Sequence, residues 1–322
     1  MRVGQPTTKV TRAETTTATT TTPSTTTTAQ TAKTTTTTPA APTTHVKEFV
    51  MTQATTTLPA LPKGAPLHTK ARTERPAGYP VRAVVDDAHV AWRVPLPGYA
   101  PPDFTDPKVF TASWAEPADV TLKKAFPSTV GAIVVDGRGR PLNPMGRTGV
   151  EGRGLLGKWG ANPAGDPIVT RVDPQSGAVE LLAIQRKDSG QWALPGGMVD
   201  DGEDIFNTVA RELFEETGVV LDFSDAAHVY AGYVDDRRNT DNAWMETTVK
   251  HKHLSADDAA RLVPKGQDDA MDATWLRLTP ENVGSLYASH GAFVKTALKA
   301  LLKDPSLAAP TRAHLRSLVV GA

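Results

Sequence analysis

The chain is organised around residues 197–219, GMVDDGEDIFNTVARELFEETGV. The turn at 200–202 ends a preceding strand, and the acidic residues that follow it lie where the dipole of a helix favours negative charge. We therefore predict a helix from about Glu203 to Thr217. Gly218 stands where a C-terminal helix cap requires a left-handed residue, so we expect the helix to end there.

This predicted helix has two different faces. Its apolar stripe repeats every four residues and consists of Ile205, Val209 and Leu213. Another face carries three carboxylates, those of Glu212, Glu215 and Glu216, which repel one another. Arg211 can pair with Glu215, but one guanidinium cannot neutralise the whole set. A solvated acidic surface is the simplest alternative. Hard oxygen ligands on one helix suit Mg²⁺, with Mn²⁺ as a second possibility.

The spacing of these residues resembles a known signature. Gly197 is followed after five residues by Glu203, and after seven more by the run RELFEETG, residues 211–218. This pattern resembles the Nudix box of hydrolases that cleave nucleoside diphosphates linked to another group. The resemblance implies an α+β fold, a Nudix α/β/α sandwich with a mixed sheet, and a metal-dependent reaction.

The composition excludes several classes of protein. The chain has 322 residues, with 35 basic and 35 acidic side chains and no cysteine. Zero net charge argues against general nucleic-acid or membrane-surface binding, so we expect neither kind of partner. No apolar run is long enough to span a bilayer. Without cysteine there are no disulfides and no thiolate metal site.

Residues 1–60 form a tail in which about half of the residues are threonine. Such a segment has too few apolar side chains to fold, so we expect it to be disordered. The basic residues Arg2, Lys9 and Arg12 faintly resemble a transit peptide, but threonine runs lack the apolar face of a targeting helix. We expect a cytoplasmic protein, with a mitochondrial location as the alternative if the tail directs import.

For residues 61–165 the sequence predicts a small, loop-rich, mostly-β domain. Short apolar runs at 81–85, 90–94 and 132–135 indicate strands. The aromatic residues of this region are most simply explained as core or domain-interface residues: Trp92, Tyr99, Phe104 and Trp114. The region ends in a segment, 142–160, in which six glycines from Gly146 to Gly160 alternate with cationic residues. Bare amides and cations there suit an anion, and a flexible connection between domains is an equal alternative.

Residues 166–322 alternate between strand and helix patterns. Strands are predicted at 168–172, 179–185, 192–194, 228–234, 245–251 and 273–278. Besides the box helix, helices are predicted at 255–262, capped by Ser255, and at 293–302 and 311–319. A mixed sheet with the box helix on one face follows from this order.

Outside the box, the chain resembles the mitochondrial-type ADP-ribose pyrophosphatases and the related Nudix-like domains of ADP-ribose-gated channels. Four stretches carry the resemblance, 143–160, 192–202, 232–247 and 286–290. Two departures are an arginine, Arg237, in place of an expected proline, and a shorter N-terminal region before Val134. The resemblance implies that ADP-ribose binds between the two domains. It also implies substrate contacts from Asn143, Arg147, Gly197, Asp236, Arg238, Ser289 and His290.

The resemblance further implies the catalytic residues. Glu212, Glu216 and Glu215 would bind Mg²⁺, with the main-chain carbonyl of Gly196 as a further ligand. Glu203 would support this cluster, and Arg211 would orient Glu215. The general base would be a box glutamate or an acid from the later loop, Asp268 or Asp269. Trp244 would stack on adenine or lie in the core, two interpretations that the sequence does not separate.

Three functions agree with these residues. The first is hydrolysis of ADP-ribose to AMP and ribose 5-phosphate by a monomer. The second is an ADP-ribose sensor without catalysis, which the presence of all three box glutamates opposes. The third is a Nudix hydrolase of another nucleoside diphosphate derivative.

Overall fold

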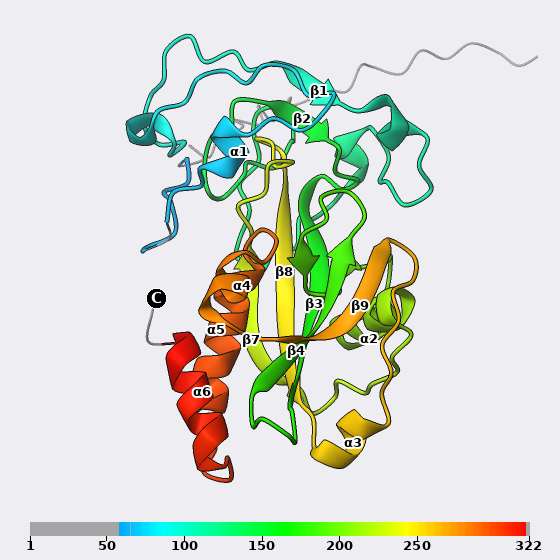
Figure 1. The fold of residues 1–322 in the computed structure, drawn as a ribbon. Coiled ribbons are helices and arrows are strands. Elements are labelled where there is room, and N and C mark those ends of the chain that lie inside the picture. Colours follow the sequence, from blue (N-terminus) through cyan, green and yellow to red (C-terminus); the bar gives the residue numbers. More distant parts are fainter. Residues whose placement is uncertain (1–57, 65, 320–322) are drawn as a thin grey trace, which may run out of the picture. The chain divides into compact units, whose positions relative to one another are not determined.

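A mixed sheet centred on strand β3 (Gly160–Val172) is the main element of the computed structural model, which describes residues 58–64 and 66–319. β3 pairs in parallel with β8 (Ala243–His253), and β8 pairs antiparallel with β7 (Ala227–Tyr233) (Figure 1). On its other side β3 meets β6 (Gly197–Met198) and β4 (Val179–Arg186). β4 in turn pairs with β5 (Trp192–Ala193) and β9 (Ala270–Arg277). The fold class, a Nudix α+β fold with a mixed sheet, is confirmed.

All six strands predicted after residue 166 are present, but β3 begins eight residues before the predicted start at 168. Pro163 and Pro167 lie inside it and lack the amide that a strand interior normally donates. Pro167 lies between Gly165, where β6 pairs with β3, and Thr170, where β4 pairs with it, so only β8 pairs with β3 at this proline. A proline is tolerated where a strand is paired on one side.

The box helix α2 (Ile205–Thr217) covers one face of the sheet. It begins two residues later than predicted because the Asp204 side chain accepts the N–H groups of Phe206 and Asn207 and caps the helix. Gly218 ends it with φ +69°, as expected. The apolar stripe is confirmed, since Val209 and Leu213 are fully buried.

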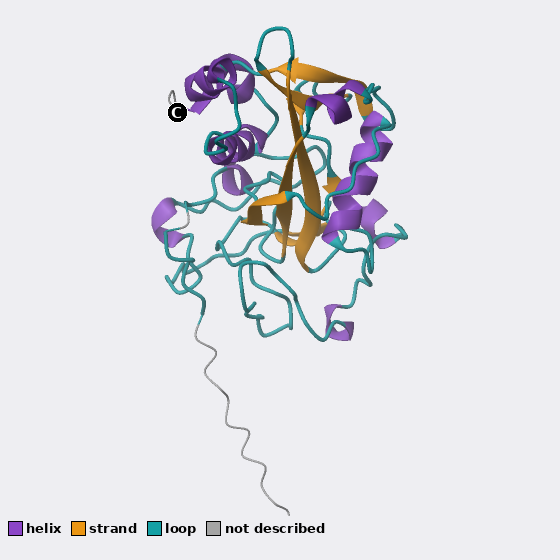
Figure 2. Cartoon of the chain, turned by 90° about the horizontal axis from the view of Figure 1, so that it is seen from below, coloured by secondary structure: helices purple, strands orange, loops and turns teal. Residues whose placement is uncertain are grey.

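The opposite face of the sheet is covered by helices from the end of the chain, α4 (Pro280–Gly284), α5 (His290–Leu301) and α6 (Ala309–Val319). Figure 2 shows helices on both sides of the strands. Ile168 and Leu181 of the sheet pack with Val294, Leu298 and Leu315 of these helices. The short helix α3 (Ala256–Ala260) follows β8 and is capped by Ser255 as predicted.

The region before β3 has little regular structure. It contains helix α1 (Lys70–Thr73), three 3₁₀ turns (Asp87–His89, Pro107–Phe110 and Val120–Leu122) and one parallel pair of strands, β1 (Asp103–Thr105) and β2 (Glu151–Gly154). The strands predicted at 81–85, 90–94 and 132–135 are wrong. Their main-chain groups bond to loops instead, as in Ala83 N–H to Gly149 O and Arg147 N–H to Val90 O.

The glycine-rich segment is packed rather than open. A Cβ at Gly146 would overlap the carbonyl of Val90, and one at Gly149 would overlap that of Ala83; both glycines have positive φ. These contacts agree neither with a flexible connection between domains nor with open backbone amides at Gly146 and Gly149. The expected disordered tail lies, through residue 57, outside the described residues. Within the part that is described, no helix is both long and apolar enough to cross a bilayer.

Candidate functional site

Arg211 organises the carboxylates of α2. Its Nε and Nη2 each donate to a different oxygen of Glu203, both at 2.9 Å, and Nη1 donates to Glu212 at 2.9 Å and Glu215 at 3.0 Å. Nη2 also donates to the carbonyl of Met198, the residue after the box glycine. The guanidinium therefore holds three carboxylates against the strand that precedes the helix.

The carboxylates differ strongly in their electrostatics. The two hydrogen bonds from Arg211 lower the pKa of Glu203 to about 2. Burial raises the pKa of Glu212 to about 7, although Arg211 partly opposes this effect. Burial also raises the pKa of Glu216 to about 8, and its carboxylate accepts the Gly196 N–H at 2.9 Å. Burial therefore disfavours the charged forms of Glu212 and Glu216 most strongly among the box carboxylates, and a nearby cation would offset this cost.

The donor set fits a divalent metal ion in its chemistry. Glu212 and Glu216 supply hard oxygen ligands. The charges of Glu215 and Glu203 help to raise the pKa of Glu212, and the charge of Glu212 helps to raise that of Glu216, which indicates that these carboxyl groups lie close together. No cluster of three or more acidic or histidine side chains among residues 58–64 and 66–319 is arranged as a ready metal site. One carboxylate oxygen of Glu212 and one of Glu215 accept hydrogen bonds from Arg211. To bind a metal through these oxygens, the two side chains must turn partly away from Arg211.

A polar lobe of about 310 Å³, here called the ribose lobe, opens beside Gly196 and Gly197. Ser289 and His290, at the start of α5, contribute to its wall. His290 Nδ1 accepts the Leu194 N–H at 2.9 Å, so the neutral ring carries its proton on Nε2. Burial lowers the pKa of His290, which favours this neutral form. Ser289 makes no capping bond with its side chain, so both residues can bond a ligand.

The predicted turn at 236–238 forms another wall of the ribose lobe. Asp236 accepts two bonds from the Arg238 guanidinium, both at 2.9 Å, and one from its main-chain N–H at 2.7 Å. Burial opposes ionisation of Asp236, but the Arg238 fork outweighs it and the pKa is lowered. The two predicted contacts therefore act as one charged unit.

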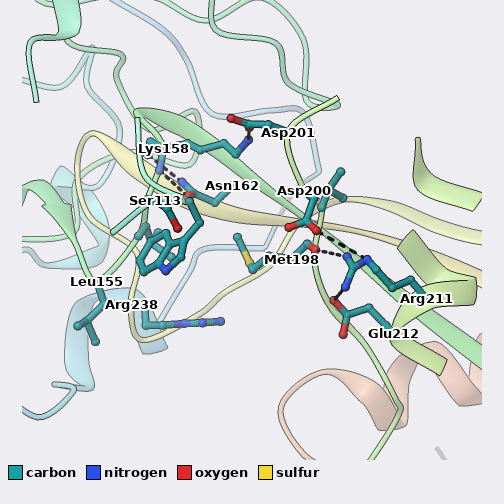
Figure 3. A pocket seen from close by; sticks show the side chains of 14 residues that line it. Ser113, Leu155, Lys158, Asn162, Met198, Asp200, Asp201, Arg211, Glu212 and Arg238 are labelled. Carbon is teal, nitrogen blue, oxygen red and sulfur yellow. Dashed lines mark hydrogen bonds and ion pairs between the residues drawn. The ribbon is translucent and has the colours of Figure 1, made fainter. Parts of the chain in front are cut away.

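A second lobe of about 600 Å³, here called the indole lobe, lies on the other side of Arg238. It shares Leu155, Met198 and Arg238 with the ribose lobe. Figure 3 shows Arg211 and Glu212 on one side of it, with Leu155 and Arg238 opposite. Lys158 pairs with Asp201 across its rim. Glu212 therefore lines one of two neighbouring cavities that share three lining residues.

Two predicted substrate contacts do not reach this cleft. Asn143 is buried and donates to the Thr240 carbonyl at 3.0 Å. Arg147 is stacked on Trp92 and Tyr99 and donates to the carbonyls of main-chain residues 89, 91 and 92. Neither lines either lobe. Their contacts are structural, because carbonyls inside the fold accept from the Asn143 amide and from both Nη atoms of Arg147, although Arg147 Nε is buried without a partner.

The loop with the candidate bases lies next to the end of α2. Gln267 donates its N–H to the Glu216 carbonyl at 3.0 Å, and the charge of Asp269 raises the pKa of Glu216. Asp268 and Asp269 are both exposed. Asp268 adopts a left-handed conformation, φ 43°. Their role as general base stays a prediction.

Several residues of the cleft escaped the sequence reading. Asp166 and Arg186 line the ribose lobe, where Arg186 pairs with Asp188 and stacks on Tyr287. Asp166 lies inside β3 and Arg186 is the last residue of β4, and no motif marks either of them. Trp114 was expected in the core or an interface and instead lines the indole lobe. Trp244 is fully buried and bonds Glu246, so it belongs to the core.

Comparisons with protein families agree with this geometry. The NUDIX domain model matches residues 162–295, and the NUDT9-like N-terminal domain model matches residues 85–160. The two matches meet at the start of β3, a few residues before the predicted domain boundary between 165 and 166.

Three relatives span most of the described residues. A Caenorhabditis elegans protein described as nudix hydrolase 6 is 44% identical, over 66% of this chain and 88% of that protein. The mitochondrial ADP-ribose pyrophosphatase of Rattus norvegicus is 38% identical, over 71% of this chain and 77% of that protein. A melastatin-like transient receptor potential channel of Nematostella vectensis is 38% identical over 72% of this chain but only 18% of the channel. This chain therefore belongs to the Nudix hydrolase family and carries a NUDT9-like N-terminal domain.

Proposed function

We propose that the chain hydrolyses the diphosphate bridge of ADP-ribose, with Mg²⁺, to AMP and ribose 5-phosphate. The observation that carries this proposal is the position of Glu212 at one of two neighbouring cavities that share Arg238. A substrate with two different ends and a charged bridge between them matches this arrangement. The name of the rat relative and the charge of the site support the same substrate.

Nudix enzymes generally use a divalent ion, and Mn²⁺ is a possible substitute for Mg²⁺ here. Glu212 and Glu216, with Glu215 and the Gly196 carbonyl, would hold it. When bound, the ion would neutralise bridge oxygens and lower the pKa of the attacking water. Arg211 keeps the carboxylates in register, and Arg238 would contact the diphosphate. The Nε2–H of His290 and the hydroxyl of Ser289 would bond the terminal ribose.

The reaction breaks one bond and forms another. The water oxygen bonds to a phosphorus of the bridge while the bond from that phosphorus to the bridging oxygen breaks. The water proton passes to a carboxylate, a box glutamate or Asp268 or Asp269, and the bridging oxygen leaves with the other phosphate. Positioning and charge stabilisation would supply most of the rate enhancement.

The test is to incubate the full chain and Mg²⁺ with ADP-ribose, a nucleotide sugar and a dinucleotide, and to identify products by phosphorus NMR. We expect AMP and ribose 5-phosphate from ADP-ribose, at a kcat/KM at least about 10-fold above the others, which corresponds to one charge-assisted contact. Binding of ADP-ribose without turnover would instead indicate a sensor, in line with the channel relative. Faster cleavage of another compound would replace the substrate.

The remaining expectations are proposals as well. We propose that the protein is a monomer, which size-exclusion chromatography with light scattering tests. We also propose that the chain divides at 165/166 into an N-terminal cleft domain and a hydrolase domain. We propose a cytoplasmic location. The rat relative is named as mitochondrial, which supports the alternative location that microscopy of a tagged full chain would distinguish.

A further inference from the structure

The indole lobe differs in chemistry from the ribose lobe. Both lobes have charged lining groups and share Leu155 and Met198. Trp114 lines only the indole lobe, whereas of these two lobes only the ribose lobe is lined by Ser289 and His290. Trp114 is 57% exposed, an unusual state for the largest apolar side chain in an otherwise folded region. Trp114 lines the same cavity as Glu212, so a ligand in this cavity can cover its ring.

The Trp114 side chain is held in a prepared position. Gly157 lies against the indole so closely that a Cβ there would be 2.6 Å from the ring carbon Cε3. Two residues after the tryptophan, Glu116 donates its N–H to the Gly157 carbonyl at 3.0 Å. The Glu116 carboxylate also accepts the Trp159 N–H at 2.9 Å. The loop that carries Trp114 is therefore fixed to the segment behind it.

Arg153 reinforces this attachment from inside the protein. Its side chain is fully buried, and Nη1 donates to the carbonyls of Glu116 at 2.6 Å and Gly157 at 2.8 Å. The guanidinium lies over the rings of Phe110 and Trp159. A buried cation that joins the two segments beside an exposed indole keeps that indole from collapsing onto the surface.

We propose that Trp114 is the platform on which the nucleobase of the substrate stacks, which fixes the direction of binding in the cleft. The proposal rests on the proposed function, because it names the subsite of the same substrate. The base would lie in the indole lobe between Trp114 and the apolar groups of Leu155 and Met198. The diphosphate would pass Arg238 and Glu212, and the terminal ribose would lie beside Ser289 and His290.

The chemistry of the two lobes decides this direction. A purine has two flat apolar faces, and stacking on an aromatic side chain contributes about 1–3 kcal/mol per base, which is roughly 5- to 150-fold in affinity. A ribose without a base offers hydroxyl groups, which the imidazole and hydroxyl of the ribose lobe can bond. The indole lobe, at about 600 Å³, is also the larger of the two lobes.

The experiment measures binding of AMP and of ribose 5-phosphate separately, by titration calorimetry on the full chain. The variants are Trp114→Ala, Trp114→Phe and the control Leu122→Ala, which removes an equally exposed apolar side chain that lines neither lobe. Thermal unfolding verifies that each variant is folded. We expect Trp114→Ala to weaken AMP about 5- to 150-fold. Ribose 5-phosphate should change less than about twofold, and Trp114→Phe should retain most of the affinity for AMP because a ring remains.

Three results would overturn the proposal. The first is that wild type and Trp114→Ala bind AMP with the same affinity. The second is that Trp114→Ala loses affinity for ribose 5-phosphate but not for AMP. The third is that the wild type does not bind AMP. Binding needs no turnover, so this test is separate from that of the proposed function. A chain that binds AMP through Trp114 but does not cleave ADP-ribose would uphold the platform and refute the proposed reaction.

Discussion

At the scale of single residues, Arg211 and Glu216 have opposite environments on the same helix. Arg211 satisfies Glu203, Glu212 and Glu215, whereas Glu216 is 94% buried, with an exposed fraction of 6%, and its carboxylate bonds a main-chain amide. A buried charge with so little compensation is unfavourable for stability. The chain retains it where the proposed chemistry requires a carboxylate.

Glu216→Gln should therefore separate activity from stability. The neutral amide removes a buried carboxyl without changing shape, so we expect the melting temperature to stay unchanged or to rise by a few degrees. Turnover of ADP-ribose should fall by about 100-fold or more, because a metal ligand is lost. Glu281→Gln, at an exposed acid in the first turn of α4, is the control: it should leave turnover unchanged and lower stability by no more than about 1 kcal/mol, the contribution of its charge to the helix dipole. Wild-type turnover by Glu216→Gln at saturating Mg²⁺ would refute the ligand assignment.

His251 gives stability a dependence on pH. Burial and, to a smaller extent, the neighbouring His253 together lower its pKa to about 4. Its Nε2 is hydrogen-bonded to Thr170 Oγ1 at 2.8 Å. The unfolded chain binds a proton near pH 6.5 and the folded chain only near 4, so this contribution is full above pH 6.5 and is lost as pH falls to 4. The slope is about 1.4 kcal/mol per pH unit.

Urea unfolding of wild type and His251→Gln between pH 7 and 4 tests this. We expect the wild type to lose about 3 kcal/mol more than the variant across that window. The difference between the two proteins cancels the contributions of His68 and Asp241, whose pKa values burial shifts to about 4 and about 6. Parallel curves for the two proteins would show that His251 titrates normally in the folded chain.

At the scale of elements, the turn that carries Asp236 and Arg238 is held by the segment before residue 85. Tyr79 donates its hydroxyl to the Arg238 carbonyl at 2.7 Å. Arg82 donates to the carbonyls of Arg237 at 2.6 Å and Asn239 at 3.2 Å. The N-terminal region thus positions main-chain atoms of the turn at 236–238, although the side chains of Tyr79 and Arg82 line neither lobe.

Arg82→Met should loosen this turn. The loss of charged donors to several carbonyls should lower stability by about 1.5–3 kcal/mol and kcat/KM for ADP-ribose by about 10-fold or more, since Arg238 loses its fixed position. Arg312→Met is the matched control, because Arg312 also donates to carbonyls, those of residues 302, 304, 305 and 307, but at the far end of the chain. Equal losses of activity in both variants would mean that stability alone explains the effect.

At the scale of the whole molecule, the N-terminal region and the sheet depend on each other. Glu246 on β8 accepts bonds from Ser128 and Thr129, and Asp241 just before β8 accepts them from Tyr99 and Thr148. These acids are buried, so their partners compensate a large desolvation penalty. Most of these contacts join the two regions across the predicted boundary.

The fragment 166–322 should therefore fail to reproduce the full chain. It cuts β3 after Gly165, removes half of its pairing with β8 and leaves Glu246 and Asp241 without their partners. We expect it to unfold at a temperature at least about 10 °C lower and to lack ADP-ribose hydrolysis. Removal of residues 1–57 is the control, and from the composition of the tail we expect no change in either property. A fragment as active as the full chain would refute a shared cleft.

The sequence by itself determined the box helix, its buried stripe and its acidic face, because periodicity, caps and charge are local properties of the chain. It also located the strands of the sheet after residue 166, where alternation is strong. It was wrong about the strands before residue 140, since short apolar runs with β-branched residues can pack as loops when their backbone groups find distant partners.

Only the tertiary structure decided which cations and aromatic rings face the cleft. Arg147, Arg153 and Arg238 are all cations on irregular or short segments near the cleft in sequence, yet the first two are enclosed by carbonyls and rings and the third lines both lobes. Trp114 was expected in the core or at the domain interface and instead lines the indole lobe, whereas Trp244, for which the sequence left both adenine stacking and the core open, lies in the core. Whether a side chain is covered depends on segments that are distant in the sequence, such as Gly157 against Trp114, and no local pattern records those contacts.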